Sequence, residues 1–358
     1  MLKSIEIKNF KAIQSTTINL TDLSVFVGNN GSGKSSVIEA LQLLQNALSF
    51  GLSTAFLERW YGFEYIRNAT ENKNDIELTL CVELKGKNLT YTVGFNVSDN
   101  GDLYLVSKEN LKEDKAFIIG QKGKTKEIDK TSQLKLCKHD DQRAIDLRNY
   151  ISSWQFLCLE PEKMYRPTQR DYSAESVRMK TSGENLAIFY RRLLDKPELS
   201  KAIHDKLRYV LPDLDYVVDY ELPVLKQVYL FLKEQHTDRR LQSWLFSSGT
   251  LRILTFLSVL NGEVPPSVVF IEEIENGLDP RTLNLLVSEM QGLLPETQFI
   301  TTTHSPYFLD LVDLRHVIVA ERKDGNTVFH RPDDDEKLDA WKEKFSAGNL
   351  YTMNKLTQ

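Results

Sequence analysis

One stretch of eight residues, Gly28 to Ser35, constrains this chain more than any other. It reads Gly-Asn-Asn-Gly-Ser-Gly-Lys-Ser and matches the phosphate-loop pattern G-x-x-x-x-G-K-[ST] at every fixed position. An apolar segment, Leu23–Val27, precedes it, and a helical apolar pattern follows it to about Phe50. Strand, glycine-rich loop and helix occur in the order that a phosphate site needs, because loop N–H groups and the helix N-terminus supply the donors.

This match makes the whole loop a candidate nucleotide site. Lys34 would reach the β- and γ-phosphates, and the Ser35 hydroxyl would bind Mg²⁺. A glycine-rich turn that matches by chance is the alternative, and the flanking strand and helix argue against it. The candidate nucleotide ligands are Gly28, Asn29, Asn30, Gly31, Ser32, Gly33, Lys34, Ser35 and Ser36.

The composition is that of an ordinary globular protein. The 358 residues allow two domains, or one large domain with an insertion, and can bury a substantial core. A formal charge of −5 argues against a protein coated with nucleic acid, although a local basic face stays open. The three cysteines are widely spaced, so neither a disulfide framework nor a zinc site is indicated. The sequence shows no signal peptide and no bilayer-spanning apolar run, and we expect a cytoplasmic protein without membrane contact.

Hydrophobic periodicity predicts how the middle of the chain is organised. Residues 75–120 alternate with a period of two and carry turn residues at the corners, which is typical of an antiparallel meander. Residues 182–209 show a helical pattern, and two short strands, 216–220 and 224–232, follow. The lysine-rich segment 108–148 also contains acids, so we expect a solvated, partly mobile face there, with a nucleic-acid contact as the alternative.

A second apolar strand supplies the acidic half of the predicted site. Val268–Ile271 is followed directly by Glu272 and Glu273. A buried parallel strand that ends in two carboxylates is the partner that a phosphate loop requires, since one acid holds magnesium and the other orients or deprotonates the attacking water. We assign Glu272 to the metal and Glu273 to the water. A surface acid pair at a strand end is the simpler alternative.

Two further features lie at the ends of predicted elements. His304 follows another buried strand, residues 298–303, and we expect it at the nucleotide rather than in the core. Ser247 and Gly249 precede a helical run, where they would make either an ordinary helix cap or a second anion-binding N-terminus. Because the phosphate loop already uses one such N-terminus in each chain, a second one implies that two subunits grip the γ-phosphate from opposite sides.

The order of these motifs resembles an ABC-type ATPase head of the SMC/RecF/OLD-like group. Phe246-Ser-Ser-Gly-Thr-Leu-Arg252 is similar to the signature of that group, and Ile271-Glu-Glu-Ile-Glu-Asn-Gly-Leu-Asp-Pro280 to its acidic motif. The opening Ile-Glu-Ile-Lys-Asn-Phe-Lys-Ala is similar to that of RecF-like proteins. The resemblance implies an α/β fold, a P-loop ABC-type ATPase head with an antiparallel β meander and an inserted helical lobe. We expect the head to comprise residues 1–160 and 241–358, with the lobe at 161–240.

The resemblance also implies how these residues act. Ser247 and Gly249 of one head would cap the γ-phosphate of ATP held by the phosphate loop of the other. His304 resembles the switch histidine of such dimers, and Asp279 the conserved-loop aspartate at the nucleotide. Gln155 is the candidate for the glutamine that links Mg²⁺ to the inserted lobe. Glutamate in place of the usual metal-side aspartate, and phenylalanine in place of leucine in the signature, are read as subtype markers.

Three functions fit these patterns. The first is a homodimeric (or higher even-numbered) ATPase switch that acts on DNA or on an effector, in repair or anti-phage defence. The second is a transporter ATPase subunit, and the third is a nucleotide-binding structural module with negligible hydrolysis. The long spacing between Gly33 and Gly249 argues against the transporter, and the lack of heptads argues against a coiled-coil arm. Only about fifty residues follow His304, so a nuclease or other effector would be a separate chain.

Overall fold

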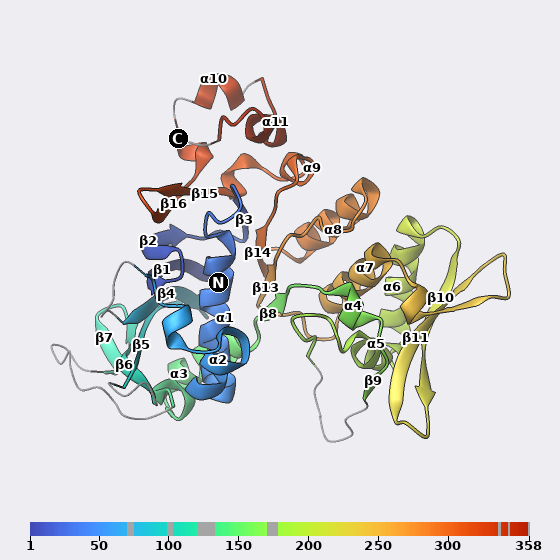
Figure 1. Ribbon diagram of the computed structural model, residues 1–358, viewed down its shortest axis with the longest axis horizontal. Helices are drawn as coiled ribbons and strands as arrows, with labels where there is room; N and C mark the ends of the chain where they lie inside the picture. Colours follow the sequence, from blue (N-terminus) through green and yellow to red (C-terminus); the bar gives the residue numbers. More distant parts are fainter. Residues whose placement is uncertain are drawn as a thin grey trace. The chain divides into compact units, whose positions relative to one another are not determined.

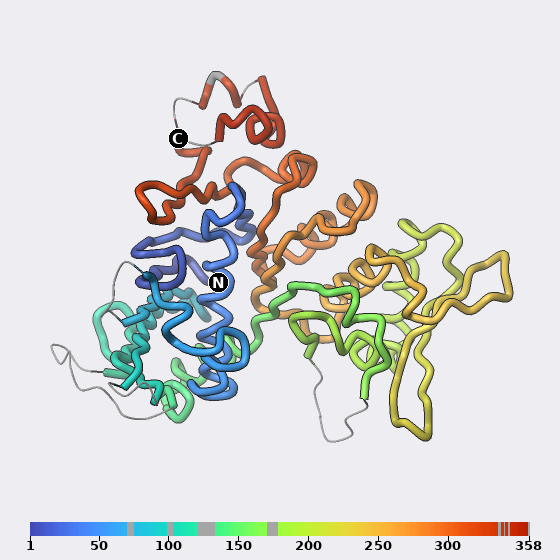
Figure 2. Tube along the Cα trace, in the orientation of Figure 1, coloured from blue at the N-terminus to red at the C-terminus, as the bar shows by residue number. Residues whose placement is uncertain are grey.

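The structure is a computed structural model and describes residues 1–69, 75–98, 103–120, 133–169, 178–335, 338–342 and 344–356. The chain forms two compact units. The first comprises Met1–Trp154 and Val312–Gln358, and the second comprises Gln155–Leu311. Figure 2 follows the chain out of the first unit in green and back into it in orange-red. The expected domain bounds at residues 160 and 240 stay a prediction.

The first unit contains a six-stranded antiparallel sheet with the order β2-β1-β4-β5-β6-β7 (Figure 1). The predicted meander is confirmed, because β4 to β7 follow one another as antiparallel neighbours. Alternate residues of β4, such as Ile76, Leu78 and Leu80, are fully buried, which fixes the register of a sheet with one covered face. The strands are β1 Leu2–Phe10, β2 Ile13–Asn19, β4 Ile76–Leu84, β5 Lys87–Val97, β6 Tyr104–Glu113 and β7 Ala116–Ile119.

The same unit positions the phosphate loop between a strand and a helix. β3 (Leu23–Val27) is buried along its whole length, runs parallel to β15 (Val317–Lys323) and leads into α1 (Lys34–Phe50), as the sequence predicts. β15 pairs antiparallel with β16 (Asn326–His330). The other helices and turns are α2 Leu52–Trp60, η1 Phe63–Tyr65, η2 Lys135–Cys137, α3 Gln142–Ser152, η4 Leu314–His316, η5 Pro332–Asp334, α10 Asp339–Lys342 and α11 Ala347–Thr352.

The second unit contains three parallel strands in the order β14-β13-β8. β13 is Val268–Ile271, the predicted buried strand, and all four of its side chains are buried. Phe156 and Phe270 stack across β8 and β13 with ring centroids 4.3 Å apart. The elements around them are β8 Gln155–Leu157, α4 Pro161–Met164, α7 Ser248–Leu260, α8 Pro280–Leu293, β14 Gln298–Thr302 and α9 Pro306–Asp310.

A separate antiparallel sheet lies in the second unit, within the region expected to be an inserted helical lobe. Its core order is β10-β11-β12, and β9 pairs with Gln227 and Val228 of β11. Helices α5 and α6 contact it, so the lobe combines helices with a sheet (Figure 1). The predicted strands 216–220 and 224–232 are confirmed as β10 and β11, whose observed bounds are 214–222 and 227–234. The bounds are β9 Thr168–Gln169, α5 Leu186–Leu194, α6 Pro197–Val210, β10 Leu214–Leu222, β11 Gln227–Glu234, β12 Arg240–Gln242 and η3 Ser243–Leu245.

The expectation of a solvated face at residues 108–148 is wrong for several residues and lies outside the described residues at 121–132. Leu111 and Leu147 are fully buried in the first unit. Glu109 is also buried, and it accepts hydrogen bonds from the Tyr91 hydroxyl (2.9 Å) and the Leu136 N–H (2.9 Å). Burial raises the pKa of the Glu109 carboxyl. The lysine-rich composition predicted that this segment is exposed, but alternate residues of β6, such as Glu109 and Leu111, are buried in the first unit. Among the described residues, no helix has the length and apolarity needed to cross a membrane.

Candidate nucleotide-binding site

The phosphate loop in the first unit is built on glycines that no larger residue could replace without a clash. A β-carbon on Gly28 would lie 2.2 Å from the carbonyl oxygen of Ala320 in β15. One on Gly33 would lie 2.6 Å from Oγ1 of Thr327 in β16. Both glycines also have positive φ angles, 147° and 96°, which L side chains rarely adopt. We call Ala320 and Thr327 the wall of the loop, because they fix how closely its main chain can approach β15 and β16.

The end of the loop leaves phosphate-binding donors available. Gly33 is the N-cap of α1, and no side chain in the described part of the protein caps this helix. The N-terminal N–H groups of a helix need partners, and a phosphate supplies them while also meeting the positive end of the helix dipole. Lys34 is buried, and its ammonium group donates to the carbonyl oxygens of Gly28 (2.8 Å) and Asn29 (2.9 Å). The ammonium group therefore lies across the loop, and its role at the phosphates stays a prediction.

The hydroxyls of the loop divide into two kinds. Ser32 is buried, and among the described residues its Oγ has no hydrogen-bond partner. A buried hydroxyl without a partner is costly, and a phosphate oxygen would satisfy it. Ser35 is exposed in the first turn of α1 and is free to reach a metal ion. The apex, Asn29 to Gly31, borders a cavity of about 380 Å³ that Arg322 and Lys323 also line. The residues present therefore fit a triphosphate.

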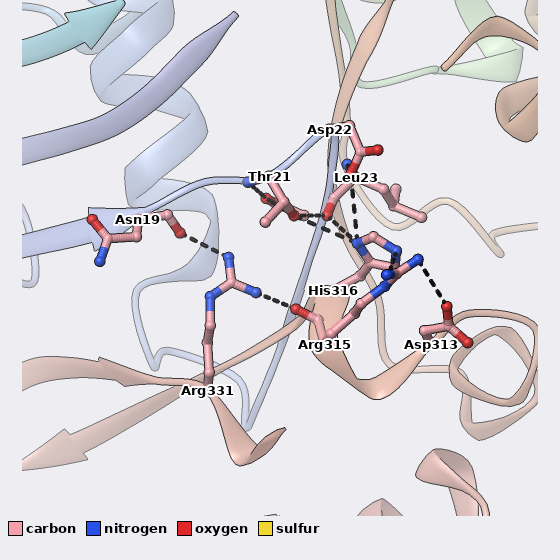
Figure 3. Close-up of polar contacts among 9 residues, drawn as sticks. Asn19, Thr21, Asp22, Leu23, Asp313, Arg315, His316 and Arg331 are labelled. Atoms are coloured by element: carbon pink, nitrogen blue, oxygen red, sulfur yellow. Dashed lines mark hydrogen bonds and ion pairs between the residues drawn. The ribbon is translucent and has the colours of Figure 1, made fainter. Parts of the chain in front are cut away.

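The start of β3 is fixed by residues from the last part of the chain (Figure 3). The imidazole Nδ1 of His316 lies 3.0 Å from the carbonyl oxygen of Leu23 and 3.5 Å from the Thr21 hydroxyl. The guanidinium of Arg331 donates to the carbonyl oxygens of Asn19 (2.8 Å) and Arg315, so it ties β2 to η4. Burial lowers the pKa of Arg331. These contacts hold the strand that delivers the phosphate loop.

In the second unit, Glu272 and Glu273 follow β13 directly, as the sequence predicts. The N–H of Glu272 donates to the Leu157 carbonyl of β8 (3.0 Å), which extends the parallel ladder by one residue. Glu273 leaves the ladder with φ = 49°, a left-handed conformation that is unusual for a residue with a side chain and costs of order 1 kcal/mol or more. Its N–H donates to Thr302 Oγ1 in β14 (2.9 Å), and its carboxylate accepts from the Asn276 amide. The exposed carboxylate is therefore held in one place.

Another glutamate joins this edge to the end of β14. The carboxylate of Glu275 accepts a hydrogen bond from the Thr303 hydroxyl (2.8 Å) and one from the N–H of His304 (2.6 Å). The main chain of His304 is thus fixed by that glutamate, and its role at the nucleotide stays a prediction. We call Glu272, Glu273, Glu275, Thr302, Thr303 and His304 the acidic edge.

The signature segment begins α7 and packs against the turn that follows the acidic edge. Ser247 is the exposed N-cap, and its Oγ accepts from the N–H of Thr250 (3.0 Å). A β-carbon on Gly249 would lie 2.5 Å from the carbonyl oxygen of Gly277, so only glycine permits this approach. Arg252, one turn later, is half-buried, and among the described residues its Nε has no partner. Burial lowers the pKa of the Arg252 guanidinium, and the nearby Cys158 and Glu273 raise it by less.

Two predicted ligands have local structural partners. Asp279 is the N-cap of α8 and accepts from the N–H groups of Arg281 (2.9 Å) and Thr282 (3.1 Å). The hydrogen bond from the Thr282 hydroxyl contributes most to lowering the pKa of the Asp279 carboxyl. Gln155 lies at the start of β8 opposite Val269, and its amide donates to the carbonyls of Phe156 and Met179. The role of Gln155 at Mg²⁺ stays a prediction, and this position gives it no support.

With the geometry of both halves described, the comparison with known families decides the identity of the fold. The family described as "AAA domain, putative AbiEii toxin, Type IV TA system" matches residues 23–310, which include the phosphate loop, the signature segment and the acidic edge. The chain belongs to this AAA family. An ATPase of the predicted kind is thereby confirmed at the level of the family.

Relatives of this AAA protein span most of its length. An ATP/GTP phosphatase of Helicobacter pylori is 23% identical over 331 residues, covering 87% of this chain and 88% of that protein. The retron Vc95 probable ATPase of Vibrio cholerae is 21% identical over 386 residues, covering 90% and 74%. A solved SMC head bound to the C-terminal winged-helix domain of ScpA superposes with a TM-score of 0.59 at 14% identity, covering 95% and 99%. The predicted likeness to SMC-type heads is therefore confirmed for the fold.

Sequence reasoning about this AAA chain missed residues that position others. Thr302, Glu275 and Gly277 bind or contact the predicted ligands, yet no role was assigned to them. Glu275 stands inside the quoted acidic motif, two residues after Glu273, and that spacing was the available signal. Thr302 gave no signal, because its partner is 29 residues away in the chain. The phosphate loop belongs to the first unit, and Gln155, Ser247, Gly249, Asp279 and the acidic edge belong to the second.

Proposed function

We propose that this chain is an ATP-hydrolysing switch whose two copies close around ATP and separate after hydrolysis, and which thereby controls a partner effector in DNA repair or anti-phage defence. The observation that carries the proposal is Glu273. Its exposed carboxylate accepts a hydrogen bond from the Asn276 amide, and its main-chain N–H donates to Thr302 Oγ1, at the end of a fully buried strand. A carboxylate fixed in that way can orient a water molecule without first losing conformational freedom.

Each residue of the site has a task in this proposal. The loop N–H groups and Lys34 bind the phosphates, and the wall keeps the loop main chain in its binding conformation. Glu273 accepts a proton from, or orients, the attacking water, and His304 follows the strand whose Thr302 binds the Glu273 N–H. Ser35 and Glu272 would hold Mg²⁺, since hydroxyl and carboxylate oxygens are the ligands this ion takes beside phosphate. Bound Mg²⁺ would neutralise charge that develops on the phosphate oxygens.

The second grip on ATP is assigned to Ser247 and Gly249 of the other copy. Ser247 is exposed at the N-terminus of a 13-residue helix, which is an environment suited to a phosphate oxygen. To test this, one copy carries Lys34→Ala and the other carries Ser247→Ala in a mixed-subunit ATPase assay. A clamp of two copies predicts that mixing equal amounts makes about half of the dimers heterodimers, each with one intact site of two, so that turnover recovers to about a quarter of the wild-type value. If mixing restores nothing while both variants still associate, the two-copy clamp is wrong.

The effector is a separate chain in this proposal. Support comes from the names of related proteins, one a retron ATPase and one an SMC head bound to a domain of a second protein. A pull-down from the native host with ATP, compared with one without nucleotide, should enrich the same partner only in the ATP sample. An ATPase rate that rises with DNA would support the DNA-linked role, and an absence of turnover would favour the nucleotide-binding scaffold instead. We also propose a cytoplasmic location, to which the three free thiols are suited.

A further inference from the structure

The antiparallel sheet of the second unit has two faces of opposite character. On one face, Val217, Val228 and Leu230 are buried, and helices α5 and α6 contact this sheet. Two acids of β10, Asp219 and Glu221, point to the same face as Val217, because residues of a strand alternate between faces. Asp219 and Glu221 both bind Arg191 of α5, at 3.5 and 2.7 Å. Arg191 thus offsets one of the two negative charges that Asp219 and Glu221 place on the covered side.

The other face carries aromatic rings. The register pairs Tyr220 with Tyr229, and their ring centroids are 5.4 Å apart. Trp244, in η3, continues the row at 5.2 Å from Tyr229. Tyr220 is 48% exposed and Trp244 is 46% exposed, so this row presents ring surface to solvent. We call Tyr216, Tyr220, Tyr229, Trp244, Lys233 and Arg240 the aromatic face.

Two cations lie among these rings. The guanidinium of Arg240 lies 5.1 Å from the ring of Phe231, and the ammonium of Lys233 lies 5.8 Å from that of Tyr216. Lys233 also has Asp215 at 3.7 Å, a partly exposed pair that contributes little. Within the described part of the chain, no carboxylate pairs with the exposed Arg240. The aromatic face therefore combines ring surface with positive charge, while the protein as a whole has a formal charge of −5.

We propose that the aromatic face binds single-stranded nucleic acid. Unpaired bases stack on exposed aromatic rings of a sheet, and neighbouring cations bind the phosphates between them. The rings of the tyrosine–tryptophan row, spaced by 5.2 and 5.4 Å, offer successive surfaces for such bases. A duplex keeps its bases stacked inside and could use only the cations. The proposal deepens the DNA-linked role under "Proposed function" and rests on that part of it, but it requires neither ATP nor hydrolysis.

Trp244 lies close in the chain to the start of the signature helix α7, so a base bound there could affect that helix. Trp244 precedes Ser247, the cap of α7, by three residues, and η3 holds it through the Ser243 hydroxyl bond to the Tyr165 carbonyl (2.7 Å). A base stacked on Trp244 would therefore restrain the segment that starts the signature helix. The proposal predicts that single-stranded DNA raises the ATPase rate of the wild type and not that of Trp244→Ala.

The test is fluorescence anisotropy with a labelled oligothymidylate of about 20 nucleotides, which exceeds the site size of one binding module. Trp244→Ala should weaken binding by at least about fivefold, since one stacked base contributes that much. Arg240→Glu should also weaken binding by at least about fivefold, because it replaces a cation proposed to bind phosphate with an anion. Trp244→Phe keeps a stacking ring and should retain binding within about twofold of wild type. The matched controls are Tyr61→Ala and Lys201→Glu, an exposed ring in the first unit and an exposed cation on α6, and both should bind as wild type. Circular dichroism checks that each variant is folded.

Three outcomes would overturn the proposal. The first is no binding of the oligonucleotide by folded wild-type protein, and the second is equal binding by Trp244→Ala, Arg240→Glu and the controls. The third is loss of a protein partner, with no oligonucleotide binding, in the two aromatic-face variants, which would make the face a protein interface. Lys34→Ala separates the two proposals, because it should bind the oligonucleotide normally. If the wild-type protein binds the oligonucleotide normally but does not hydrolyse ATP, the ATPase-switch proposal is wrong and the nucleic-acid proposal stands.

Discussion

The phosphate loop is shaped by its main chain, whereas the acidic edge is held together by contacts that side chains make. The loop depends on glycines because Ala320 and Thr327 leave no space for a β-carbon. The acidic edge depends on hydroxyls and carboxylates from two strands, joined by the Glu273–Thr302 and Glu275–His304 contacts. The difference teaches that the loop is encoded by a short local pattern, whereas the acidic edge forms only where the ends of two strands come together. Mutations should therefore affect the two halves in different ways.

The largest effect is expected at Glu273. Glu273→Gln keeps the size and the Asn276 contact but removes the base, so turnover should fall by about 10² to 10⁴-fold. ATP affinity should stay unchanged, and the ATP-bound dimer should persist in size-exclusion chromatography. The matched control is Glu296→Gln, an exposed acid of the same unit, which should turn over normally. Normal hydrolysis by Glu273→Gln would show that the base lies elsewhere.

Lys34 tests the loop side of the comparison. Lys34→Ala removes the cation proposed to bind the phosphates, so ATP affinity should fall by about 100-fold, equivalent to about 3 kcal/mol. Isothermal titration calorimetry measures this, with Lys323→Ala as a control from the rim of the same cavity. Unchanged affinity in Lys34→Ala would contradict the assignment of the phosphate site.

Glycine substitutions separate space from backbone strain within one loop. Gly33→Ala meets Thr327, while Gly31→Ala has nothing within 4 Å, yet both positions have positive φ. We expect Gly33→Ala to lower ATP affinity by about tenfold or more, and Gly31→Ala by about fivefold, the cost of left-handed strain alone. Adding Thr327→Ala to Gly33→Ala should recover the difference in the same titration. Equal losses of ATP affinity in Gly33→Ala and Gly31→Ala, with no recovery in the double variant, would show that the wall does not restrict the loop.

Thr302 tests whether side chains hold the acidic edge. Thr302→Val removes the acceptor of the Glu273 N–H and leaves that donor without a partner, so kcat should fall by about tenfold. Thr302→Ser keeps the hydroxyl and should restore the rate. A rise in KM with normal kcat would instead indicate a role in binding.

Asp279 should give the smallest effect, because its interactions are local. Asp279→Ala removes the N-cap of α8 and should lower the free energy of unfolding by about 1 kcal/mol, while Asp279→Asn preserves the cap. The pKa of Asp279 lies below its ordinary value of 3.8, so the stabilisation is fully present above pH 3.8 and is lost as pH falls through the native pKa. Urea unfolding at pH 7 and at acidic pH measures both effects. Loss of ATP binding in Asp279→Ala with normal stability would support the nucleotide role predicted from the sequence.

The sequence predicted the loop and the β13 strand correctly because both are encoded by short local patterns. Glycine at fixed spacing and four apolar residues before two acids require no knowledge of distant contacts. The wall could not be predicted, since Ala320 and Thr327 lie nearly three hundred residues beyond the loop and carry no motif of their own. The same is true of Thr302. The two faces of the β10–β11 hairpin were also missed, because only strand register shows that its acids and its aromatic residues point in opposite directions.

The wall of the phosphate loop also has a consequence for synthesis of the chain. The loop leaves the ribosome early, but β15 and β16 follow only near the end, and the family match stops at residue 310, before either strand. At typical elongation rates the nascent N-terminal segment waits roughly 15–60 s for Ala320 and Thr327. ATP that met the loop during synthesis would therefore meet it before the wall is in place, and a fragment that ends before β15 would carry every recognised motif without Ala320 and Thr327.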